Sequence, residues 1–186
     1  MPFIIIGRTT CCISGKLLQA DDKIVAFPPF ACDSNEAEFV CYEGVALREE
    51  FETWVLRNSI TKRVKEFWVQ SYHTTKAFRV ITEDDDYLLV RSLAESKLRL
   101  FFLQHVFGID IPRTNWREFC KQLGTAEMTT VIPLETGIVL SFAKEVDRVS
   151  LCLRIEEALG HDCIDLSPTE WLRLQTVLLA HATVSD

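Results

Sequence analysis

The sequence has few of the features that identify membrane, secreted or metal-binding proteins. No apolar run among the 186 residues approaches the ~20 residues that a membrane helix requires, so we expect no membrane partner. The seven cysteines are odd in number, scattered and without a CxxC pair, unlike a disulfide framework or a zinc ribbon. We therefore expect buried free thiols. The short apolar stretch before Gly7 and Arg8 is unlike a signal-peptide core, so we expect an intracellular protein, cytoplasmic or nuclear.

Catalytic motifs are missing as well. Neither GxSxG nor GxGxxG occurs, and the four histidines show no HExxH spacing. The segment 10–17 resembles a phosphate loop but lacks its first glycine and the hydroxyl residue after the lysine. The acidic run 84–86 is typical of a hairpin turn rather than of a metal site. We predict a non-enzymatic protein without cofactor or metal ion; the nearest alternative is a nucleophilic Cys163 beside His161.

An internal repeat occupies the C-terminal half of the chain. Residues 109–116 (IDIPRTNW) align without gaps with residues 164–171 (IDLSPTEW), matching Ile, Asp, an aliphatic residue, Thr and Trp. Ser167, Pro168 and Glu170 carry the signature of a capped helix start. Apolar residues then follow at helical spacing in both copies, namely Trp116, Phe119 and Leu123, and Trp171, Leu174 and Leu178. Each copy therefore predicts a helix after a short aliphatic step.

Strand patterns precede both of these helices. Apolar residues alternate with polar ones, or flank turn residues, at 78–82, 87–91, 130–132, 138–142 and 148–156. Segment 97–103 alternates at its start and then becomes wholly apolar, so a helix is an alternative there. The sequence predicts an α+β fold with tandem repeats of a three- to four-stranded antiparallel sheet followed by one helix.

The first 72 residues show a weaker version of the same pattern. The step 45–47 resembles the Ile-Asp-Ile step and precedes a helix that we expect from Phe51 through Trp68, with its aromatic residue one place out of register. Strands are expected before it at 3–7, 23–27 and 38–42. The sequence thus predicts three units, 1–72, 77–127 and 128–186. Whether the first unit, strand-rich with a long helix, is a degenerate third copy is left open.

The repeat of strands, aliphatic step and Trp-bearing helix resembles the Pur-alpha and positive-cofactor-four group of single-strand nucleic-acid-binding proteins. The resemblance is carried by 109–116 and 164–171 and covers residues 77–182. It implies that two units pair so that their helices cross behind two sheets, and that a sheet face binds single-stranded DNA or RNA. That group usually has a basic, aromatic face, whereas this chain has a net charge of −7.

Charge is distributed unevenly along the chain. Residues 128–186 carry four basic and nine acidic side chains, whereas 77–127 carry seven and eight, and 1–76 carry nine and ten. Because affinity for nucleic acid comes mainly from Lys and Arg, the last unit is a poor phosphate binder. Its acidic surface is better suited to a basic protein partner.

Two basic clusters are candidates for nucleic-acid binding. Cations and aromatic rings together suit a single strand, because bases stack on rings while phosphates meet cations. The first cluster lies on the long helix, and its candidate residues are Lys62, Arg63, Lys65 and Trp68. The second follows from strand alternation, provided that the faces coincide, and comprises Arg79, Tyr87, Arg91, Lys97, Arg99 and Phe101. The alternatives are the solvated end of an amphipathic helix and an ordinary solvated sheet face.

Two functions therefore follow from the sequence. The first is a non-enzymatic protein that binds single-stranded DNA or RNA through the middle sheet. The alternative is an acidic protein-interaction module, such as a regulatory subunit, an inhibitor or an immunity-type protein, which binds a basic partner. An odd number of units would leave one unpaired, so we also expect a homodimer.

Overall fold

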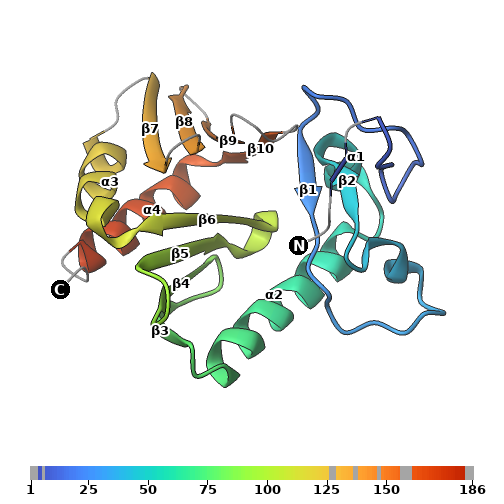
Figure 1. Cartoon of the computed structure of the whole chain (residues 1–186). Coiled ribbons are helices and arrows are strands. Elements are labelled where there is room, and N and C mark those ends of the chain that lie inside the picture. Colours follow the sequence, from blue (N-terminus) through green and yellow to red (C-terminus); the bar gives the residue numbers. More distant parts are fainter. Residues whose placement is uncertain are drawn as a thin grey trace.

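The computed structural model describes residues 4, 5, 7–125, 129–135, 138–145, 148–155 and 161–182. The chain folds into antiparallel strands and helices, of which α2 is the longest among the described residues (Figure 1). The N-terminal elements are β1 Ile24–Ala26, η1 Ala37–Cys41, β2 Val45–Leu47, α1 Arg48–Thr53 and α2 Arg57–Thr74. Antiparallel pairing of β1 with β2 makes a two-stranded sheet.

The two predicted repeats are present, each as a four-stranded antiparallel sheet followed by a helix. The middle unit comprises β3 Phe78–Glu83, β4 Tyr87–Ser92, β5 Lys97–Phe102, η2 Leu103–His105, β6 Phe107–Pro112 and α3 Arg113–Thr125. The last unit comprises β7 Thr129–Glu135, β8 Ile138–Lys144, β9 Val149–Ile155, β10 His161–Leu166 and α4 Pro168–His181. In both sheets each strand pairs with the next one along the chain. The α+β prediction is confirmed, and the alternative of a helix at 97–103 is wrong because β5 occupies most of that segment.

Helix α4 begins with the cap that its sequence predicts. The Ser167 hydroxyl accepts a hydrogen bond from the Glu170 amide, and the Glu170 carboxylate accepts one from the Ser167 amide. Two amides that the helix itself leaves without acceptors are thereby satisfied. Pro168 follows at the first turn, where a missing N–H costs nothing.

The two repeats share one hydrophobic core. It contains buried residues from both four-stranded sheets together with Trp116 of α3 and Trp171 of α4. The Trp116 indole donates a hydrogen bond of 2.8 Å to the carbonyl of His181, at the end of α4. The two helices lie against each other, so the two units form one body.

Helix α2 covers the other face of the middle sheet. Leu88, Val90 and Phe101 are buried on that face and pack against Trp68 and Tyr72 of the helix. The first turns of α2 belong to the N-terminal core, in which Ile60 and Val64 are fully buried, and Trp68 contacts both cores. The helix therefore joins the N-terminal unit to the middle unit.

Predictions for the first 72 residues are only partly correct. Strand β1 lies within the expected segment 23–27, but 38–42 falls largely in η1 and is not a strand. Ile4, Ile5 and Gly7 lie outside any strand, and the rest of segment 3–7 lies outside the described residues. The expected helix is divided between α1 and α2. That this unit is a degenerate third repeat stays a prediction, and its two-stranded sheet distinguishes it from the other two units.

The expectation of seven free thiols is wrong at two positions. Cys152 of β9 and Cys163 of β10 are directly opposite each other in the strand register and form a disulfide. Five cysteines are free, namely Cys11, Cys12, Cys32, Cys41 and Cys120. The bond to Cys152 also removes Cys163 as the free nucleophile of the enzyme alternative. Within the described part of the chain, every helix is too short or too polar to cross a membrane.

Candidate interaction cleft

The strand registers divide the predicted nucleic-acid platform between two sheet faces. Leu89 pairs with Leu100, and Val90 pairs with Arg99, so Arg99 does not share a face with Arg91. The face toward the shared core takes Arg79, Tyr87 and Arg91, and the face toward α2 takes Lys97, Arg99 and Phe101. Alternation identifies faces within one strand, but only the register between strands shows which faces coincide.

The two aromatic members of that platform are not available to stack on bases. Tyr87 is 2% exposed and donates a hydrogen bond to the Glu170 carbonyl. Phe101 is 8% exposed, and its ring lies 4.7 Å from the ring of Trp68. The sequence does contain a signal for this burial, because 87–90 is a continuous apolar run. Such runs are typical of strands that are covered on both faces.

Most of the predicted cations are already paired with carboxylates. Arg63 lies 2.8 Å from Glu36, Lys65 lies 3.1 Å from Asp85, and Arg99 lies 3.2 Å from both Glu95 and Asp110. Lys62 is exposed, and its ammonium lies 4.0 Å from the Glu66 carboxylate. Ion pairs of this kind lower the charge that a phosphate would meet.

Arg79 and Arg91 are the exception. They are direct cross-strand neighbours in β3 and β4, and neither forms a salt bridge with another residue that the structure describes. Two like charges opposite each other repel, so this pair adds no stability to the sheet. Among the predicted site residues, the fold therefore brings these two arginines together without placing a described carboxylate in an ion pair with either.

A cleft of about 420 Å³ lies between the N-terminal unit and the last sheet. Its walls come from the turn before β1, from the junction of β2 with α1, and from β10. The charged residues that line it are Asp21, Asp22, Lys23, Arg48, Glu49, Glu52 and Asp165, and Leu47 and Cys163 complete the lining. Five carboxylates against two cations make this cleft acidic. No local sequence pattern predicts this cleft, because the segments that form its walls are far apart along the chain.

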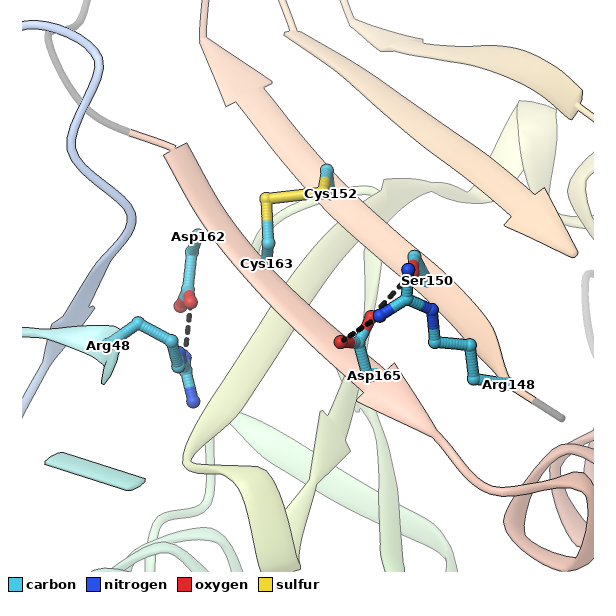
Figure 2. The surroundings of a disulfide bond; sticks show 7 residues. All are labelled: Arg48, Arg148, Ser150, Cys152, Asp162, Cys163 and Asp165. Carbon is cyan, nitrogen blue, oxygen red and sulfur yellow. Dashed lines mark hydrogen bonds and ion pairs between the residues drawn. A yellow bond between two sulfur atoms is a disulfide. The ribbon is translucent and has the colours of Figure 1, made fainter. Parts of the chain in front are cut away.

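The cation at the base of this cleft is neutralised within the protein. Arg48 is 4% exposed and donates a hydrogen bond of 2.6 Å to the His105 carbonyl. Its other terminal nitrogen forms an ion pair with Asp162 of β10 (Figure 2). Burial raises the pKa of the Asp162 carboxyl to about 6, although the Arg48 charge acts in the opposite direction. The buried Arg48 Nε has no hydrogen-bond partner within the described residues.

The carboxylates at the rim are mostly free to bind a ligand. Asp21, Glu49 and Glu52 are exposed and make no salt bridge with a described residue. Asp165 accepts a hydrogen bond from Ser150 and contacts Arg148 (Figure 2). Its carboxylate lies 3.8 Å from the Arg148 guanidinium. Glu49 also stands in the first turn of α1, where the helix dipole favours a negative charge. The rim therefore presents several carboxylates that a basic ligand can reach.

Comparisons with family models, with curated proteins and with solved structures find no match to this chain. The resemblance to the Pur-alpha group stays a prediction. The fold and the acidic cleft are the observations from which a function is inferred.

Proposed function

We propose that this chain is a non-enzymatic protein-interaction module that binds a basic segment of a partner protein in the acidic cleft. The observation that carries the proposal is the set of five carboxylates around a cleft whose one buried cation, Arg48, is already neutralised by Asp162. A Lys or Arg side chain of the partner would meet uncompensated negative charge there. Net charges of −7 for the chain and −5 for residues 128–186 would speed the encounter with a basic surface.

The test is the binding of a labelled oligo-arginine peptide to the whole chain, followed by fluorescence anisotropy at low and at physiological salt. The triple variant Asp21→Asn, Glu49→Gln, Glu52→Gln removes three rim charges. Because exposed charges contribute ~0.2–1 kcal/mol each, the loss of three should lower affinity by about threefold to 150-fold. The control for one charge lost outside the cleft is Glu118→Gln, at an exposed position of α3 that does not line the cleft. Equal losses in both variants would contradict the proposal.

Binding of single-stranded nucleic acid is a second candidate, and the uncompensated Arg79–Arg91 pair supports it. The same chain is titrated with labelled single-stranded DNA and RNA. Replacement of both arginines by Gln should weaken binding and reduce the salt dependence by about one to two released counterions. Arg117→Gln, at an exposed position of α3, is the control for the loss of one positive charge outside this pair. If the chain does not bind nucleic acid at low salt, this candidate is excluded. The peptide titration then decides the proposal of a basic protein partner independently.

The cellular location and the assembly state are also proposals. Five free cysteines support a reducing compartment, the cytoplasm or the nucleus. The Cys152–Cys163 disulfide forms only when an oxidant, such as a small disulfide, takes two electrons from these two thiols. A homodimer is testable by sedimentation of the purified chain, and a mass of one chain over the working concentration range would contradict it.

A further inference from the structure

Two cysteines that are distant in sequence lie in contact within the N-terminal unit. The sulfur atoms of Cys12 and Cys41 are 3.3 Å apart, although 29 positions separate the two residues. Cys12 lies in the turn after Cys11, and Cys41 is the last residue of η1. Because a disulfide joins its sulfur atoms at ~2.05 Å, an approach of little more than 1 Å would allow the bond to form.

The backbone around this pair holds both residues in position. The Cys12 amide donates a 2.8 Å hydrogen bond to the Val45 carbonyl, and the Gly44 amide donates one of 3.0 Å to the Cys41 carbonyl. A side-chain Cβ at Gly44 would lie 3.3 Å from both the Cβ of Cys12 and the Cα of Cys41. The glycine thus leaves the space in which the two cysteines meet.

The two thiols differ in exposure and in acidity. Cys12 is half-buried, whereas Cys41 is fully buried. The hydrogen bond with Cys41 lowers the pKa of the Cys12 thiol, and the same interaction, with burial, raises the pKa of Cys41 far above its ordinary value. The thiolate is the reactive form, so Cys12 is the nucleophile that a reagent from solution reaches first. The neighbouring Cys11 is buried, and its thiol donates to Glu50.

We propose that Cys12 and Cys41 are a thiol–disulfide exchange site whose substrate is a low-molecular-weight disulfide of the glutathione type. The Cys12 thiolate attacks one sulfur of the small disulfide, whose S–S bond breaks and whose other half leaves as a thiolate that takes a proton from water. Cys41 then loses its proton to water and attacks the Cys12 sulfur. The mixed S–S bond breaks, and the second small thiol leaves as a thiolate that takes a proton from water. Two protein thiols are oxidised to one disulfide while one small disulfide is reduced to two thiols. The site is independent of the acidic cleft and of the function proposed for it.

The test is peptide mapping of the whole chain after equilibration with graded ratios of oxidised to reduced glutathione. Acid quenching and alkylation are followed by cleavage after Lys16, Glu38 and Glu43, which separates Cys41 from Cys32. We expect a peptide containing Cys12 to become linked to the peptide containing Cys41 as the ratio rises. Fragmentation between the adjacent Cys11 and Cys12 assigns the link. The native Cys152–Cys163 link is followed in the same digest as an internal reference.

Variants distinguish the attacking thiol from the resolving thiol. Cys41→Ser should arrest the reaction at a mixed disulfide, seen as one glutathione adduct on Cys12, and Cys12→Ser should show neither adduct nor link at this site. Cys32→Ser is the matched control, because Cys32 is a half-buried free thiol of the same unit, and it should leave the Cys12–Cys41 link unchanged. The proposal is overturned if the wild-type chain forms no Cys12–Cys41 link at the most oxidising ratio. A link from Cys11, or an adduct at Cys32 alone, would overturn it equally.

Discussion

Trp116 and Trp171 stand at the same position of the two repeats and are both buried in the shared core. Trp116 is fully buried, stacks with Phe119 at 5.8 Å and donates its indole hydrogen to a carbonyl of the other helix. Trp171 packs against Phe142, with ring centroids 5.0 Å apart. At the scale of single residues, Trp116 therefore links α3 to the helix of the other unit, and Trp171 links α4 to the sheet of its own unit.

We expect either Trp→Ala substitution to lower the free energy of unfolding by about 3–5 kcal/mol, because each would leave a large cavity in the core. Urea denaturation followed by circular dichroism measures this change. The control is Leu172→Ala, since Leu172 is 63% exposed beside Trp171 and should cost no more than about 0.5 kcal/mol. A denaturation midpoint that barely moves in both Trp variants would contradict the core described above.

At the scale of elements, the two repeats differ in what covers the outer sheet face. Leu89 pairs with Leu100 in the middle sheet, and Phe142 pairs with Leu151 in the last sheet. All four side chains are buried in the shared core. The neighbouring outward positions hold large apolar residues in the middle sheet, namely Leu88, Val90 and Phe101, and small residues in the last sheet, namely Ser141, Ala143 and Cys152. Large side chains are found where α2 packs. The two repeats thus match in their core and differ on the outer sheet face.

Trp68→Ala should expose the apolar outer face of the middle sheet. The side chain is half-buried, so we expect a loss of about 2–3 kcal/mol of unfolding free energy, less than for a fully buried Trp. Binding of a dye that is specific for apolar surface should increase before global unfolding. Gln70→Ala, on the exposed side of the same helix, is the control. Dye binding equal to that of the wild type would mean that α2 does not shield this face.

At the scale of the whole molecule, a few polar contacts join all three units. Arg48 of the N-terminal unit binds the His105 carbonyl in the middle unit and Asp162 in the last one. The His105 ring lies 3.0 Å from the Glu170 carboxylate of α4. A buried ion pair adds little net stability, but leaving one partner alone is costly. We therefore infer that these contacts specify how the units are placed more than they stabilise the fold.

The Asp162 carboxyl predicts a specific dependence of stability on pH. Its pKa of about 6 in the folded chain lies above the ordinary value of 3.8, so the folded state binds this proton more tightly than the unfolded state. The associated stability is fully present below about pH 4 and is lost as the pH rises through about 6. We expect the difference in unfolding free energy between the wild type and Asp162→Asn to change over this range and to be constant above it. Denaturation at several pH values measures it.

The outcome that would contradict this assignment is a difference that stays constant from pH 4 to pH 7. Asp165→Asn is the matched control, because Asp165 lies on the same strand but is exposed. The double variant Arg48→Met, Asp162→Leu should recover much of the stability lost in Asp162→Asn, since no unpaired charge remains buried.

The sequence alone determined the features that depend on neighbours along the chain. The capped start at Ser167, the apolar spacing after Trp116 and Trp171, and the two-residue period of 148–156 all arise from interactions within a few residues. Such interactions act in any context, so the two repeats, their helices and their strand-rich character were predictable. The clustering of negative charge in the last third is likewise a property of composition.

The tertiary structure alone decided which of these local features meet. It placed Arg99 opposite Val90 and not opposite Arg91 in the strand register. It also packed α2 over Phe101, and it brought Glu49 and Asp165 to the lining of one cleft. It also put Cys12 against Cys41, and Cys152 opposite Cys163. These contacts join residues that are distant in sequence, and their geometry follows from the burial of apolar surface over the whole chain. A one-residue change of register would move each strand's side chains to the other face, and no local pattern specifies that choice.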